Sequence, residues 1–277
     1  MSLMLKLLTT TLLLSSLVNA STISKQVEKY LDNEFGDNPR ISKLEVKVIQ
    51  ETPLKELKGW STYIVDVKAV LKDKPSQTIK QKMIWFSNGI VITKALANIK
   101  TAESYTDMVK PDFQKSYYSV ANLISGSKNS KHRVAIFSDP LCPFCKDFAP
   151  GAIKYMKKQP EKFAVYYYHY PILRIHPASA IIIRAAVVAE KQGFKDVSVK
   201  MYAIKVDPRE KDVAKILTAF NKVIGSKVTQ KEIMEKDVAA HIAHDEEIAK
   251  NVFVNGTPTI YMDDKIDKTR KLYKTIK

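Results

Sequence analysis

The chain has 277 residues, 45% of them hydrophobic, with 45 basic and 29 acidic side chains and a formal net charge of +16. This length favours two modest domains over one. The basic residues are spread along the chain without a block of five, and none of the eight glycines lies in a phosphate-loop pattern, so the composition argues for a solvated basic surface and against a nucleic-acid or nucleotide partner.

Residues 1–20 have the order of a secretory signal. Lys6 precedes an apolar run near Leu7–Val18, and small residues follow up to Ala20. Threonines and serines interrupt the run, which is shorter than the roughly 18 residues that a membrane span needs. We therefore predict a signal peptide that is cleaved after Ala20, not a membrane anchor, and an exported protein.

Residues 21–95 are predicted to form a small α+β domain. Val27, Tyr30 and Leu31 share one side of an amphipathic helix at residues 22–33. Alternating apolar and polar residues then predict strands, and Ser87-Asn88-Gly89 predicts a hairpin turn into residues 90–93. The strands are expected at residues 44–48, 63–69 and 79–86. This helix over an antiparallel sheet lacks cysteine and any cluster of catalytic residue types, which indicates a module that holds something and does not carry out chemistry.

Residues 96–128 lack alternation and are expected to form a largely helical linker, so residues 129–277 form the second domain. Its pattern predicts strand, helix, strand, several helices and strand, which is an α/β order. The expected elements are a buried strand at residues 133–138, a helix from the cysteines to about residue 159, a strand at 163–170, helices over 177–252 and a strand at 259–262. A capping box at Thr229 and Glu232 and an apolar face of Met234, Val238 and Ile242 belong to the helical stretch.

The only two cysteines, Cys142 and Cys145, lie in the segment FSDPLCPFCKDF. Cys142 follows a strand and begins a helix, where free N–H groups and the helix dipole stabilise a thiolate and lower the thiol pKa. Lys146 adds a nearby cation, which Asp139 partly opposes. Pro143 suits the first helical turn, since its missing N–H would have no partner there. Cys145 lies one turn later on the same side and can attack a mixed disulfide formed at Cys142.

Two other readings of the cysteine pair carry less weight. A zinc site needs about four ligands, and only His241 and His244, spaced three apart on a helix, are available to complete one. A structural disulfide would close too short a loop to stabilise much. A redox couple is therefore the simplest interpretation, with no metal and no cofactor beyond the Cys142–Cys145 disulfide. His169 and His176 are expected to pack or cap.

Three segments, FSDPLCPFCKDF, HPASAIIIRAAVVAEKQGF and NGTPTIY, together resemble the thioredoxin-fold proteins of the bacterial Dsb group. The resemblance covers about residues 131–262, and Pro150 lies where the active-site helix of that family kinks. With its first domain and linker, the chain resembles the DsbC/DsbG subgroup. This implies a cystatin-like first domain that forms a homodimer through residues 21–95. Family members usually continue further at the C-terminus, where this chain has room for a short strand at 265–270 and barely one helical turn.

The resemblance also implies site residues. In this family the peptide before Pro258 is cis and lies beside the cysteines, which would turn the Thr257 backbone outward as an edge on which an unfolded substrate can pair. Phe144 stands where the strongly oxidising DsbA type usually has histidine. Without that imidazole, the Cys142 thiolate loses one stabilising partner, so we expect a less oxidising couple.

These observations together predict a periplasmic disulfide isomerase or reductase. Its partners would be unfolded or misoxidised exported proteins and a membrane redox protein that resets the couple, and not nucleic acid. Cys142 would attack the substrate disulfide and Cys145 would release the substrate. A dimeric dithiol oxidase, a chaperone or holdase with secondary redox activity, and a copper metallochaperone remain as alternatives, although no Met-rich or His-rich loop near the cysteines supports the last.

Overall fold

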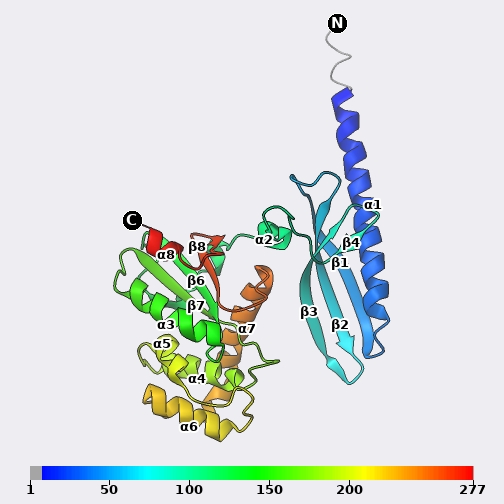
Figure 1. The fold of residues 1–277 in the computed structure, drawn as a ribbon. Coiled ribbons are helices and arrows are strands. Elements are labelled where there is room, and N and C mark those ends of the chain that lie inside the picture. The colour runs from blue at the N-terminus through cyan, green and yellow to red at the C-terminus, as the bar shows by residue number, and fades with distance from the viewer. Residues whose placement is uncertain (1–7, 277) are drawn as a thin grey trace. The chain divides into compact units, whose positions relative to one another are not determined.

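The computed structural model describes the backbone of residues 8–276 and the side chains of residues 22–276 (Figure 1). The chain divides into two compact units, with the boundary between Lys110 and Pro111. The first seven residues of the predicted signal peptide, and the side chains of the rest of it, lie outside the described residues. No helix in the described part of the chain is both long and apolar enough to cross a bilayer.

The first unit is a helix on an antiparallel sheet, as predicted. Helix α1 (Leu8–Gly36) precedes a sheet in the order β1-β2-β3-β4. The strands are β1 (Ile41–Pro53), β2 (Ser61–Leu71), β3 (Lys74–Ser87) and β4 (Ile92–Thr93). Each predicted strand lies within an observed one, and β4 pairs with β3 through the predicted turn, in which Asn88 Oδ1 accepts the N–H groups of Ile90 and Val91. The helix is longer than predicted because it begins within the segment assigned to the signal.

The core of the first unit forms where one side of α1 meets one face of the sheet. Leu31 of α1 is fully buried with Tyr63 and Val65 of β2, and Trp85 of β3 closes the same cluster. Alternate residues along a strand point to the same face, so this burial follows directly from the period of two in the sequence.

The linker predicted to be helical over residues 96–128 is not a helix. It contains only α2 (Tyr105–Val109), two short 3₁₀ turns and β5 (Leu123–Ser125). Side chains replace helical hydrogen bonds here: Asn98 Oδ1 accepts the N–H of Lys100, and Ser119 Oγ accepts that of Ala121. Asparagine and serine compete with helices in this way, and the absence of alternation alone could not distinguish a helix from such turns.

The second unit is built on a five-stranded sheet in the order β5-β7-β6-β8-β9. Its strands are β5, β6 (His132–Ser138), β7 (Phe163–His169), β8 (Thr259–Met262) and β9 (Lys265–Ile266). Strand β6 runs parallel to β7 and antiparallel to β8. It is therefore the central strand that its uninterrupted apolar run predicted, and its residues Val134–Ser138 are buried.

Helices cover both faces of this sheet. The stretch predicted to be helical over residues 177–252 is divided into four helices and short turns, with breaks at Gly193 and Gly225, which both have positive φ. The helices of this unit are α3 (Pro143–Lys157), α4 (Ser179–Lys191), α5 (Val197–Lys200), α6 (Val213–Ile224), α7 (Lys236–Asn251) and α8 (Leu272–Thr275). The single turn of α8 places Tyr273 against Phe148 and Tyr155 of α3.

The predicted details of the helical region are partly right. Thr229 and Glu232 form the capping box, with each backbone N–H donating to the other side chain, but they cap a 3₁₀ turn. Val238 and Ile242 are buried on α7, as expected. Met234 is 67% exposed, so its assignment to the same apolar face was wrong: it belongs to the 3₁₀ turn, and the period of α7 begins only at Lys236.

Gly126 should be the least replaceable glycine of the second unit. Its φ is +76°, and a Cβ there would lie 2.1 Å from the Phe163 carbonyl oxygen, which is backbone and cannot easily move. Gly225 has a similar φ of +79° with open space around it. We expect Gly225→Ala to cost about 1–2 kcal/mol of unfolding free energy, the usual penalty of the left-handed region, and Gly126→Ala to cost distinctly more.

Thermal unfolding followed by circular dichroism and by tryptophan fluorescence will test this. Both tryptophans, Trp60 and Trp85, lie in the first unit, so the fluorescence transition should move less than the transition of the second unit. Equal effects of the two alanine substitutions would contradict the role of the Phe163 contact.

Candidate active site

The two cysteines lie at the start of α3, directly beyond the C-terminal end of the central strand β6. Cys142 is the residue before the first helical residue, Pro143, and its backbone carbonyl accepts the N–H groups of Cys145 and Lys146. Both cysteines are free and buried, with Cys142 4% exposed and Cys145 not exposed at all. The pair therefore has the strand-to-helix placement that the sequence predicts.

The segment before β8 is far from the cysteines in sequence but lies next to them in the fold. The Thr257–Pro258 peptide is cis, as the resemblance implies, and the Thr257 carbonyl oxygen accepts a hydrogen bond from Cys142 Sγ at 3.7 Å. The Thr257 hydroxyl is buried and has no hydrogen-bond partner among the described residues. Residues 115 positions apart are thus brought to one thiol.

The residues between and after the cysteines face outward. Phe144 is 69% exposed, Pro143 is also exposed, and Lys146 is half-buried. The Phe144 ring therefore offers an apolar surface to solvent beside the buried thiols.

Burial raises the pKa of Cys145 to about 11, and the nearby Asp139 backbone and the side chains of Ser138 and Thr257 oppose this rise only in part. Cys145 is therefore protonated at neutral pH. Since only a thiolate is a strong nucleophile, Cys145 has to lose its proton before it can attack. Cys142, the less enclosed thiol at the helix N-terminus, is the residue suited to react first.

A chain of buried hydroxyl groups lies behind Cys145. Ser138 Oγ is 2.5 Å from the Tyr202 hydroxyl, which is 2.6 Å from that of Tyr167. Burial raises the pKa of both tyrosines, so they remain neutral donors. No sequence pattern predicts this row of hydroxyl groups, because Tyr202 lies in a short turn between α5 and α6 that no pattern connects to β6.

Asp139 anchors the loop between β6 and α3. Its buried carboxylate accepts hydrogen bonds from the N–H of Leu141 and the hydroxyl of Ser179, each on Oδ1, and from the N–H of Ile172 on Oδ2; His176 Nδ1 lies 2.8 Å from Oδ2. The sequence interpretation, in which Asp139 opposes Lys146, was incomplete, because its main partners lie in the segment before α4 and at the start of that helix. His176 packs there, as expected.

The family model described as Thioredoxin matches residues 119–277, which is more than half of the chain. The chain belongs to the thioredoxin family. Membership of this family, together with the CxxC pair at the start of α3, supports thiol–disulfide oxidoreductase chemistry, and the mixed α/β fold of the second domain agrees with the prediction. The assignment to the DsbC/DsbG subgroup stays a prediction.

Several solved structures are similar to slightly more than half of this chain. A thioredoxin-like oxidoreductase from Silicibacter pomeroyi is 22% identical over 54% of this chain and 84% of its own, with a TM-score of 0.44. ScsC from Proteus mirabilis in a compact conformation is 24% identical over 55% and 73% of the two chains, with a TM-score of 0.44. Oxidised BdbD from Bacillus subtilis is 16% identical over 60% and 92%, with a TM-score of 0.47. No curated protein matches the chain.

The thiol environments predict a large difference in alkylation. In reduced Cys142→Ser protein, only about one Cys145 in a thousand would be a thiolate at pH 8, given a pKa of about 11. We therefore expect iodoacetamide to label Cys145 in this variant far more slowly than it labels Cys142 in Cys145→Ser protein. At pH values below the Cys145 pKa, the labelling rate of Cys145 should rise about tenfold for each unit by which the pH is raised, because the thiolate fraction rises with pH. Equal labelling rates, measured by mass spectrometry, would contradict the assigned environments.

Asp139→Ala should weaken the domain, because it leaves the donors of Leu141, Ile172 and Ser179 buried without an acceptor. We expect a loss of at least about 2 kcal/mol in unfolding free energy. Asp147→Ala, which removes an exposed carboxylate from the adjoining helix α3, is the matched control and should change stability by less than about 0.5 kcal/mol. Chemical denaturation followed by circular dichroism will compare the two variants, and a similar small effect of both would remove the anchoring role of Asp139.

Proposed function

We propose that this protein is an exported, periplasmic thiol–disulfide oxidoreductase that acts as a disulfide isomerase or reductase on unfolded or misoxidised exported proteins. The observation that carries this proposal is the unequal burial of the two thiols beside the Thr257 carbonyl. Cys142 lies at the helix N-terminus with its Sγ next to that carbonyl, whereas Cys145 is enclosed and its pKa is raised to about 11 by burial.

In the proposed reaction, the Cys142 thiolate attacks one sulfur of a substrate disulfide. A mixed disulfide forms, and the other substrate sulfur leaves as a thiolate. That thiolate can attack another disulfide of the substrate, and when a substrate thiolate finally displaces Cys142 the net reaction is an isomerisation without any change in oxidation state. If the rearrangement stalls, Cys145 loses its proton and attacks Cys142, which releases reduced substrate and leaves a Cys142–Cys145 disulfide for a membrane reductant to reduce.

Thr257 has two proposed roles. Its backbone beside the cis peptide would pair with an extended segment of substrate, as strands add to an exposed edge. Its hydroxyl, buried without a hydrogen-bond partner among the described residues, would donate to the Cys145 thiolate as that charge develops. Pro258 holds the Thr257 carbonyl at Cys142, and Phe144 offers an apolar contact for an unfolded chain.

The first unit would serve assembly. Among the described residues of that unit, β1 pairs only with β2, and β3 pairs with β4 only at Phe86 and Ser87, so long edges of both strands have unpaired backbone groups in the sheet. Such edges are templates for strand addition by another chain. They support the proposed homodimer through residues 21–95, which sedimentation of the protein lacking residues 1–20 will test.

The pre-reduced protein should restore activity to a scrambled, fully oxidised multi-disulfide enzyme without an added oxidant. Cys142→Ser should abolish this activity, because no other cysteine is accessible to start the reaction. Cys145→Ser should accumulate mixed disulfides with substrate, since the escape step is lost.

Two results would change the assignment. Absence of recovery, with rapid disulfide donation from the oxidised protein to a reduced substrate, would make the protein a dithiol oxidase. Suppression of aggregation that survives replacement of both cysteines by serine, without isomerase activity in the wild type, would make it a holdase.

A further inference from the structure

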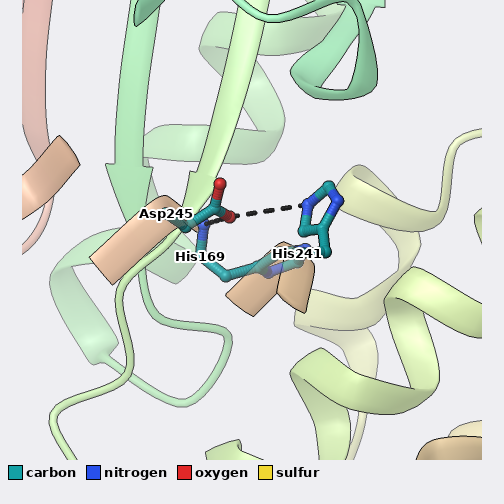
Figure 2. Close-up of side chains that lie close together, drawn as sticks. All are labelled: His169, His241 and Asp245. Atoms are coloured by element: carbon teal, nitrogen blue, oxygen red, sulfur yellow. Dashed lines mark hydrogen bonds and ion pairs between the residues drawn. The ribbon is translucent and has the colours of Figure 1, made fainter. Parts of the chain in front are cut away.

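Three potential ligand side chains meet inside the second unit, away from the cysteines. His169 ends β7, and His241 and Asp245 lie one turn apart on α7. One ligand atom of each residue lies within 4.8 Å of the others (Figure 2). His169 and Asp245 are fully or almost fully buried, at 1% and 0% exposure.

The hydrogen bonds of this cluster leave ligand positions unused. Asp245 Oδ1 accepts the side-chain amide of Asn122 at 2.7 Å, and Oδ2 accepts the His169 backbone N–H at 2.8 Å. The exposed His244 forms an ion pair with Oδ1 at 3.7 Å, which is too long for a hydrogen bond, so each oxygen keeps one lone pair. His241 Nε2 is 3.6 Å from Asp245 Oδ2, the ion pair dashed in Figure 2 and too long for a hydrogen bond.

Two buried polar atoms in this cluster have no hydrogen-bond partner among the described residues. They are Nδ1 of His169 and Oδ1 of Asn122. A buried polar atom without a partner costs free energy, and each such case in a folded protein calls for an explanation such as an ion. The two orphaned atoms belong to one potential ligand and to the side chain that positions another.

We propose that His169, His241 and Asp245 bind a divalent transition-metal ion of the zinc class. Two imidazoles and one carboxylate are a ligand set that zinc accepts, and the i, i+4 spacing of His241 and Asp245 places both on one face of α7. The present separations exceed those of bound ligands, so binding draws the three side chains together. The Asn122 side-chain amide and the backbone N–H of His169 orient the Asp245 carboxylate, as outer-shell donors do at metal sites.

The fourth ligand comes from an adjoining cavity of about 350 Å³. His241 and Glu190 both line this cavity, so Glu190 or a water molecule can complete a tetrahedral ion. Three lysines line it as well. Lys157 pairs with Asp196, and Lys191 pairs with Asp237, so these two charges are compensated. Only Lys195 opposes a cation there without an ion pair among the described residues.

This site differs from the zinc site weighed in the sequence, which needed the cysteines and His244. Here Asp245 and the buried His169 replace them. Because β7 and α7 are far apart in sequence, a bound ion would link the sheet to the helix that leads into the Thr257–Pro258 segment. We infer a structural role for the ion, separate from the proposed thiol chemistry.

The experiment uses protein in which both cysteines are replaced by serine, so that zinc cannot bind the thiols and the result is independent of redox activity. After removal of metal with a chelator, zinc is titrated in competition with a chromophoric chelator. We expect one equivalent to bind and to raise the unfolding temperature. His241→Gln and His169→Gln should each weaken binding at least tenfold, and Glu190→Gln will show whether that side chain is the fourth ligand or whether water is.

His132→Gln is the matched control, because His132 forms a histidine–aspartate pair with Asp263 on the surface of the same unit. It should leave zinc affinity unchanged. X-ray absorption at the zinc edge of the protein with all histidines intact should show two imidazole ligands. This measurement does not depend on whether the histidine variants fold. Failure to bind one equivalent, equal weakening by His132→Gln and His241→Gln, or a spectrum without imidazole would each overturn the proposal.

Discussion

The geometry of the cysteine pair depends on the buried Asp139 carboxylate. The central strand β6 passes into α3 through a short buried loop. The backbone polar groups of this loop cannot bond to water, so they need hydrogen-bond partners in the protein. Asp139 supplies them by accepting donors from its own loop, from Ile172 and from Ser179. One side chain therefore holds the β6–α3 turn against the segment that leads into α4, and the position of Cys142 follows from that turn.

The same enclosure makes the two thiols chemically different. Cys145 lies in the interior of the domain, where the neighbouring polar groups include Ser138 and the hydroxyls of Tyr202 and Tyr167. These groups are neutral donors that bond to one another and supply no positive charge to stabilise a thiolate. Burial therefore has the largest effect on Cys145 and raises its pKa. Cys142 has the helix N-terminus on one side and the Thr257 carbonyl on the other. A single turn of helix thus separates two thiols with different surroundings.

The sequence was most informative where a local pattern determines the structure. The apolar run of β6, the alternation of β1 and β2, the proline at the first turn of α3 and the strand at Thr259–Met262 each follow from short-range rules. It was least informative where side chains override the pattern. The expected linker helix fails because Asn98 and Ser119 bond to nearby backbone, and Met234 was misplaced because a 3₁₀ turn interrupts the helical period.

The missed parts of the site have a common physical cause. Asp139, Tyr202 and Asp245 are each defined by partners tens of residues away, such as His176, Ser138 and Asn122. Their chemistry arises from burial, which makes an unpaired polar atom costly and so forces distant segments to supply complementary groups. A local pattern shows where a chain enters the core but not which polar groups meet there. The cis peptide at Pro258 was expected only because three separate segments together resembled one family, and such a combination is the sequence signal that carries long-range information.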